Sequence, residues 1–439
     1  MEKKIATIPT PNYDDIVHFI KQSGNITSRH KATEVLDYLL PLKDEWKEYY
    51  KIVDSHVFPQ IYERIASAYR ILEQYDDGIK ALQECLNVIE NATEYEWLFG
   101  VKSRLFQYLA ILYYDINDIE KTKNALSDSI FYFLTFYNNK HYGNREFFSF
   151  RPISDYLLDS IKNNYITVTD PQEFNDPVDP AMLSHLDYLA NHAQDENSKH
   201  LYLIQKEIFG KVRIRSLVRT LPIALNEGRD VTNVEEVERE RNLTTMWAYY
   251  ADFHKGVCIK YKFPSSLTTH ETNKNAVLML GEVTYKANYD LTKTDIELQE
   301  ALFGKGLHWQ YEHESRLVYF HRYKNEKFMR INLPEDCITE IYIGIRTPYA
   351  DKLKIKEAVK NKPNIKLFQM KLSDANLFQL DSEPIDIKTW LNEPKSLKQE
   401  LEKLRTLEDA SILKAIQQID EITTKIEMTN NELVNFLKK

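Results

Sequence analysis

Hydrophobic residues recur every three or four positions through the first 140 residues, a period that predicts amphipathic helices. Within residues 56–136 small and aromatic residues stand at the same offsets in two copies, 44 residues apart. The aligned positions are Ala66, Tyr69, Gly78 and Cys85 in the first copy, and Ala110, Tyr113, Thr122 and Ser129 in the second. Small residues at these offsets let two antiparallel helices approach closely. We therefore predict helical hairpins over residues 1–140, and we expect Pro41 to end or break one helix.

From residue 142 the pattern changes to short runs rich in β-branched and aromatic residues, separated by helical segments. Strands are predicted at residues 146–151, 165–169, 211–217, 257–261, 283–285, 338–344 and 366–370. Helices are predicted at residues 154–162, 183–210, 244–252, 295–303 and 349–360. A turn is predicted at residues 254–256, where Gly256 makes a positive φ cheap. This mixture predicts an α+β domain over residues 141–390.

Residues 391–439 make up a third segment, in which leucine and isoleucine recur at spacings of three and four. This period predicts an amphipathic helix or coiled coil that begins after Pro394. Two uses stay open, a helix folded back on the preceding domain and an arm that joins copies into a homo-oligomer. The chain is thus predicted to be multi-domain, with all-α hairpins, an α+β domain and a C-terminal amphipathic helix.

Composition narrows the class of protein. The net charge of −9 argues against nucleic-acid binding by the whole chain. The three cysteines, Cys85, Cys258 and Cys337, stand far apart without a CxxC pair, so we expect neither a disulfide framework nor a Cys-rich zinc site. This cysteine usage fits a reducing cytoplasm. The first residues lack the apolar core of a signal peptide, and no run of about 18 apolar residues predicts a membrane span.

The densest polar pattern lies in residues 307–318, where apolar and charged side chains alternate. A strand would place Glu312, Glu314 and Arg316 on one face, because residues two apart share a face. One interpretation is a structural ion-pair ladder in which Arg316 neutralises a glutamate, since buried charges need partners. The other is that one glutamate faces a cleft and binds a sugar or moves a proton.

The middle of the chain, roughly residues 145–375, resembles the bacterial family known as domain of unknown function 2971. The resemblance rests on Phe150, Arg151, Phe174, Asn175, Asp176, Pro177, Met246, Trp247, Ala248, Tyr250, Ala251, His254, Lys255, Gly256, Val257, Cys258, Tyr285, Trp309, Tyr311, Glu312, Glu314 and Arg316. That family has no settled activity, and its members resemble accessory and defence-associated proteins. The hairpins resemble tetratricopeptide repeats, which implies a surface for a protein partner. Together these resemblances imply a cytoplasmic bacterial sensor–effector in phage defence or stress.

Polar residues on three predicted strands are similar to the arginine, serine or threonine, and ExE positions of mono-ADP-ribosyltransferases. In that resemblance Arg151 holds the phosphates of NAD, and Thr167 or Thr169 orients the nicotinamide ribose. Glu314 stabilises the developing oxocarbenium charge, as glycosidase carboxylates do, and Glu312 helps to activate the acceptor. NAD is then the expected substrate, and no metal is expected. Aromatic residues would wall the pocket, although such residues more often form core: Trp247, Tyr250 and Trp309.

Two other classes of function stay open. A metal-dependent nuclease or hydrolase would gather ligands around a divalent cation from Asn175, Asp176, Asp179, His254, Glu312 and Glu314. The Asn-Asp-Pro run among them is also typical of a tight turn. A non-catalytic protein-interaction protein needs no cleft, and it predicts that the carboxylates of Glu312 and Glu314 are fully paired and inaccessible to solvent.

Overall fold

A computed structural model describes residues 13–24, 26–50, 57–90, 97–139, 146–174, 176, 179–219, 244–264, 267, 275–292, 298–374 and 380–386. The chain divides into two compact units. Unit 1 comprises Met1–Ser149, Asn163–Met246 and Ile259–Ile338, and unit 2 comprises Phe150–Lys162, Trp247–Cys258 and Thr339–Lys439. The predicted C-terminal helix lies outside the described residues, and so does its predicted role in forming a homo-oligomer.

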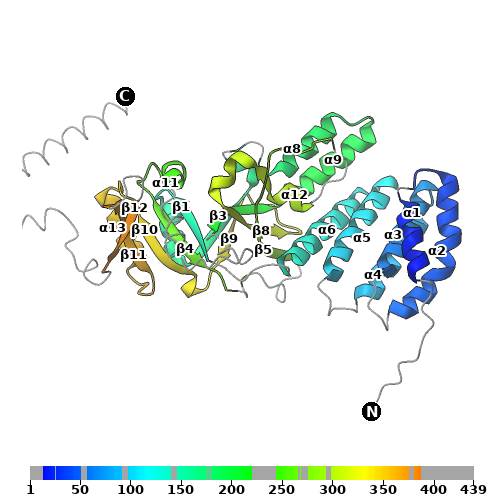
Figure 1. Ribbon diagram of the computed structural model, residues 1–439, viewed down its shortest axis with the longest axis horizontal. Coiled ribbons are helices and arrows are strands. Elements are labelled where there is room, and N and C mark those ends of the chain that lie inside the picture. Colours follow the sequence, from blue (N-terminus) through cyan, green and yellow to red (C-terminus); the bar gives the residue numbers. More distant parts are fainter. Residues whose placement is uncertain are drawn as a thin grey trace, which may run out of the picture. The chain divides into compact units, whose positions relative to one another are not determined.

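Unit 1 begins with the predicted all-α region, which Figure 1 shows as successive helices. The helices are α1 (Tyr13–Ser23), α2 (Arg29–Tyr50), α3 (Val57–Ile71), α4 (Tyr75–Glu90), α5 (Trp97–Asp115) and α6 (Ile119–Asn139). The prediction for Pro41 was wrong, because α2 runs through it without ending. Pro41 itself is exposed, whereas Leu39 and Trp46 on either side of it are fully buried. This burial offsets the lost backbone hydrogen bond.

The repeat predicted at a spacing of 44 residues is visible in the turns of the two hairpins. Glu73 and Asn117, at equivalent positions, have positive φ angles of 63° and 59°. The following residue in each copy donates its N–H to the carbonyl of the repeated tyrosine, Tyr69 or Tyr113. Gly78 lies close to the neighbouring hairpin helix, because a Cβ there would lie 3.1 Å from a Leu112 side-chain carbon, a tight contact.

The sheet of unit 1 is centred on β3 and is antiparallel. On one edge β3 pairs with β8, and β8 pairs with β5. On the other edge β3 pairs with β2 at Ile214 and with β1 at Val218, and β2 continues to β9. The strands are β1 (Glu146–Arg151), β2 (Tyr165–Thr169), β3 (Arg213–Arg219), β5 (Ala276–Glu282), β8 (Glu314–His321) and β9 (Phe328–Asn332).

Strand register decides which side chains face the helices of unit 1. Ile214, Val318 and Met279 are paired across β3, β8 and β5 and therefore share one face. These residues belong to the same hydrophobic core as residues of α6 and of three later helices. Figure 1 shows these helices as ribbons. Those helices are α8 (Ala181–Asn191), α9 (Glu196–Phe209) and α12 (Leu298–Phe303). The predicted helical stretch at residues 183–210 is therefore two helices.

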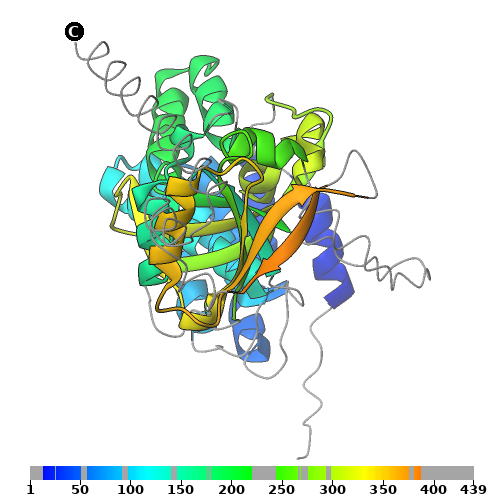
Figure 2. The same cartoon turned by 90° about the vertical axis from the view of Figure 1, so that its left-hand side faces the viewer.

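Unit 2 contains a smaller α+β arrangement. Strand β10 (Ile338–Ile343) pairs in parallel with β11 (Lys366–Leu372), and α13 (Tyr349–Val359) connects them. Strand β12 (Leu380–Ile385) pairs antiparallel to β11, as the neighbouring orange arrows in Figure 2 show. Among the described elements, five contain residues of both units: strands β1 and β10, helices α7 (Asp155–Asn163) and α11 (Thr244–Tyr250), and strand β4 (Val257–Lys262).

Candidate functional site

The segment with the densest polar pattern is not one strand, as predicted, but two elements. Residues Leu307–Glu312 form a 3-10 helix, His313 has a φ of 44°, and β8 begins at Glu314. The prediction therefore holds for Glu314 and Arg316, which share a face of β8, and was wrong for Glu312, which ends the 3-10 helix.

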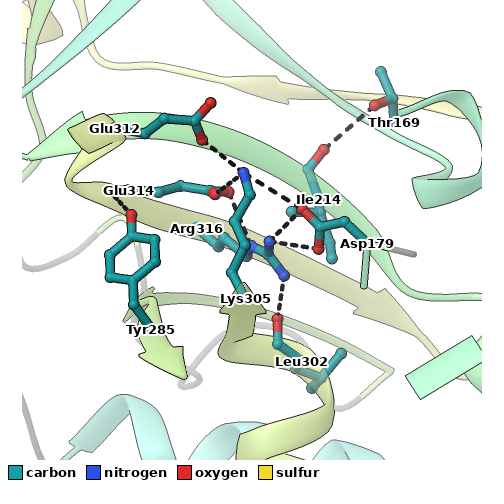
Figure 3. Close-up of polar contacts among 9 residues, drawn as sticks. All are labelled: Thr169, Asp179, Ile214, Tyr285, Leu302, Lys305, Glu312, Glu314 and Arg316. Carbon is teal, nitrogen blue, oxygen red and sulfur yellow. Dashed lines mark hydrogen bonds and ion pairs between the residues drawn. The ribbon is translucent and has the colours of Figure 1, made fainter. Parts of the chain in front are cut away.

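Arg316 is the centre of a buried charge cluster in unit 1, drawn in Figure 3, and its side chain is fully buried. Its Nε donates to Glu314 at 2.9 Å, and one terminal nitrogen donates to both carboxylate oxygens of Asp179 at 2.5 and 2.6 Å. The other terminal nitrogen donates to the carbonyl of Leu302 at 2.5 Å. Every nitrogen of the guanidinium thus has an acceptor.

Lys305 is the second cation of the cluster, on β7 (Gly304–Gly306), which pairs with β6 (Thr284–Lys286). Its Nζ lies 2.6 Å from Glu312, 2.8 Å from Glu314 and 3.6 Å from Asp179. The same ammonium lies 5.1 Å from the centre of the Trp309 ring. Lys305 therefore joins all three carboxylates of the cluster, as Figure 3 shows.

The cluster holds three carboxylates and two cations, so it carries one net negative charge when every group is ionised. Burial acts to raise the pKa of Glu314, but Arg316 and Lys305 outweigh it and lower that pKa to about 2. For Asp179 burial prevails over the opposing effect of Arg316 and raises the pKa. Although burial opposes it, the carboxylates of Glu314 and Glu312 raise the pKa of Lys305.

A small polar cavity adjoins the charge cluster at Asp179. Its volume is about 200 Å³, and its lining includes Asp176, Asp179, Ser184, Asp187 and Lys206. Tyr285 lies on another side of the cluster, where its hydroxyl oxygen accepts the backbone N–H of Glu314 at 2.7 Å. Burial raises the pKa of Tyr285 to about 12.

The two threonines proposed to orient a ribose lie apart from the glutamates. Thr169 pairs with Ile214 on β3, whereas Glu314 pairs with Val218 on the opposite edge of that strand. Strand spacing places the Cα atoms of Thr169 and Glu314 roughly 16 Å apart. The Thr169 hydroxyl donates to the carbonyl of Ile214 at 3.4 Å, and Figure 3 shows it away from the cluster. Thr167 pairs with Arg330.

The remaining proposed cofactor residues fall in both units. Trp309 contacts Lys305 in unit 1, whereas Arg151, Trp247 and Tyr250 belong to unit 2. Trp247 is fully buried. The structure therefore brings Glu312, Glu314 and Trp309 together around Lys305, and the NAD-binding roles of all eight residues stay predictions.

The turn predicted at residues 254–256 has its left-handed residues earlier in the chain than predicted. Asp252, Phe253 and His254 have positive φ angles of 47°, 52° and 69°, whereas Gly256 does not. Gly256 is required for space, because a Cβ there would lie 2.1 Å from the Arg151 carbonyl oxygen. Backbone hydrogen bonds hold the turn, including those from Phe253 to Ala248 and from Gly256 to Ala251. Three consecutive non-glycine residues in this conformation store strain of about 1 kcal/mol or more each.

Sequence reasoning did not identify Lys305 or connect Asp179 with Arg316. The signal in the sequence was the position of Lys305 between Gly304 and Gly306. The structure leaves no room for a side chain at Gly304, since a Cβ there would lie 2.4 Å from the Glu300 carbonyl oxygen. Asp179 was considered only as a metal ligand. Among the described residues no group of three His, Cys, Asp or Glu side chains is placed to hold a metal. Asn175, from the predicted ligand set, lies outside them.

Residues 246–317 match a family model described as "Protein of unknown function (DUF2971)". The matched segment contains Trp247, Tyr285, Lys305, Glu314 and Arg316, and it confirms the resemblance drawn from the sequence. No curated protein and no solved structure matches the chain. In the part of the chain that the structure describes, no helix has the length and apolar character required to span a membrane.

Proposed function

We propose that this chain is a cytoplasmic protein-interaction protein, whose helical hairpins bind a protein partner and whose family region is a rigid module. One observation carries the proposal: Glu312 and Glu314 are only 4% and 2% exposed, and both carboxylates are ion-paired. This is the arrangement expected of a non-catalytic protein. A ribose could reach Glu314 only after the cluster had opened, which would leave buried charges without partners.

The cysteines support the proposed compartment. Cys85, Cys258 and Cys337 form no disulfide bond, and all three are buried. Such thiols fit the reducing conditions of the cytoplasm. A sensor–effector role in phage defence or stress, with the hairpins as sensor, follows from the family resemblance.

The hairpin surface offers a chemically defined place for a partner. Helices α3 and α5 open the two repeat copies, and polar pairs connect them: Arg104 with Glu63 at 3.1 Å and Arg70 with Asp115 at 2.6 Å. The two arginine side chains are about half exposed. In the repeats that this region resembles, these first helices form the partner-binding surface.

The test is affinity capture from the cells that carry this chain, followed by charge reversal on α3 and α5. The double variant Arg70→Glu with Arg104→Glu should lose a partner that the wild-type chain retains. Lys199→Glu, at an exposed position on α9, is the matched control and should retain it. A partner that binds both variants equally does not use this surface, and its retention would overturn this part of the proposal.

NAD chemistry is the second candidate, favoured by the opposite pKa shifts of two neighbouring carboxyl groups. The pKa of Glu314 is lowered and that of Asp179 is raised, a split that is typical of acid–base pairs in active sites. The cavity beside Asp179 would admit part of a ligand. Release of nicotinamide from NAD, lost in a folded Glu314→Gln variant, would support it. Release that persists in that variant would exclude Glu314 as the catalytic residue.

A further inference from the structure

One face of the sheet in unit 1 carries hydrogen-bond donors that have no acceptors. The Nε atoms of Arg215 and Arg219 and the hydroxyl of Ser315 are buried without a hydrogen-bond partner among the described residues. Ser315 is only 1% exposed. Buried polar groups are normally paired, so a group of unpaired donors in one place points to a ligand that would supply acceptors.

Strand register places these three donors together. Leu217 on β3 pairs with Ser315 on β8, and Arg215 and Arg219 flank Leu217 two residues away on the same face. Ser149 on β1 joins the group, because its hydroxyl oxygen accepts a hydrogen bond from Arg215 at 2.6 Å. The guanidinium groups of Arg215 and Arg219 and the hydroxyls of Ser149 and Ser315 are therefore grouped around Leu217.

The two buried arginines of the same sheet, Arg213 and Arg316, have acceptors for all their nitrogens, unlike the half-buried Arg215. Arg316 donates to two carboxylates and one carbonyl. Arg213 donates to three backbone carbonyls and to the side chain of Asn325. Arg215, in contrast, has Ser149 as its acceptor. Within β3 and β8, therefore, the buried donors without acceptors lie on the face that carries Ser315.

The charge of the group fits an anion. The carboxylate of Glu282 belongs to the group, since Glu282 pairs with Ser315 across β5 and β8 and forms an ion pair with Arg219. Two arginines against one glutamate leave one net positive charge. Arginine donors together with a hydroxyl are the groups that proteins use to bind phosphate oxygens.

We infer that Arg215, Arg219 and Ser315 form a binding site for a phosphate group, carried by inorganic phosphate or by a nucleotide. The site is separate from the charge cluster, because Val218 and Glu314 face the opposite side of the same sheet. It does not depend on the proposed partner-binding surface of the hairpins. A bound phosphate would satisfy the unpaired donors and stabilise the β3–β8 pairing around it.

The experiment is calorimetric titration of the full chain with inorganic phosphate and, separately, with ADP, at constant ionic strength. Arg215→Gln should weaken binding about tenfold or more, the effect of losing one charge-assisted hydrogen bond. Ser315→Ala should weaken it as well, and this variant should fold normally because the hydroxyl it removes has no partner. Arg330→Gln is the matched control, an arginine of the same sheet paired with Thr167 on β2, and should bind like the wild type.

The two ligands distinguish the source of the phosphate. Tighter binding of ADP identifies a nucleotide site, and equal or tighter binding of inorganic phosphate identifies a site for the free anion. Absence of binding by both ligands in the folded wild-type chain would overturn the inference. So would equal affinities in the wild type, Arg215→Gln and Ser315→Ala.

Discussion

Replacing Lys305 by methionine is the most informative perturbation of the charge cluster. The substitution removes the cation that joins Asp179, Glu312 and Glu314 but keeps a side chain of similar length. Within the cluster three carboxylates then stand against one cation, Arg316, and the net charge of the cluster changes from −1 to −2. Glu312→Gln is the opposite perturbation, because it brings the cluster to neutrality while Lys305 keeps Glu314.

Because the two substitutions change the net charge of the cluster in opposite directions, they should lower the free energy of unfolding by different amounts. Removing one partner from a buried ion pair costs about 3–5 kcal/mol of unfolding free energy, and the Lys305 side chain is 8% exposed. We therefore expect Lys305→Met to cost about 4 kcal/mol. Glu312→Gln leaves no cation without a carboxylate and should cost about 1 kcal/mol. The difference in unfolding free energy between Lys305→Met and Glu312→Gln tests the charge count of the cluster more directly than either loss alone.

Urea unfolding and hydrogen exchange of the β8 amides measure these effects together. Burial already raises the pKa of Asp179, and the loss of Lys305 removes a cation that opposes this rise, so part of the stability lost in Lys305→Met should return as Asp179 takes up a proton at lower pH. Glu312→Gln should show no such recovery. Equal losses in the two variants, or a pH-independent deficit in Lys305→Met, would refute the reasoning.

Three further predictions follow from single contacts. The pKa of Glu314 is lowered in the folded state from 4.5 to about 2, so its contribution is present above pH 4.5 and lost as the pH falls toward 2. That contribution is at most about 3 kcal/mol, partly offset by the raised pKa of Asp179, and acid titration of the urea midpoint measures it. Gly281→Ala should cost about 2 kcal/mol of unfolding free energy, measured by the same method, since its Cβ would lie 2.3 Å from a ring carbon of buried Phe303. Gly256→Ala should destabilise unit 2 by about 3 kcal/mol, because the obstacle is a backbone oxygen that has little freedom to move, and faster hydrogen exchange in α11 and β4 would report it.

The helices could be predicted from the sequence because their signals are local. Periodicity indicated α3–α6, and the 44-residue offset located the paired turns at Glu73 and Asn117. Pro41 failed as a helix terminator because the burial of Leu39 and Trp46, a tertiary effect, outweighs the loss of one hydrogen bond. Strands β5, β9 and β12 were not predicted. Their partners β8, β2 and β11 lie elsewhere in the chain, and pairing between distant segments leaves little local signal.

The candidate site was predictable only in part for the same reason. The spacing of Glu314 and Arg316 within one strand correctly placed both on one face. Asp179 lies 137 residues from Arg316 along the chain, and no motif connects the two. Whether a glutamate is paired or available depends on such distant partners, so the sequence left that question open.

The measurement that tests the central claim most directly is a paired assay of the wild type and Glu314→Gln. It combines nicotinamide release from NAD with the free energy of unfolding. A structural role for Glu314 predicts that the variant loses about 3 kcal/mol of stability and that neither protein releases nicotinamide. Release by the wild type, abolished in a variant with unchanged stability, would contradict that role and identify Glu314 as a catalytic residue.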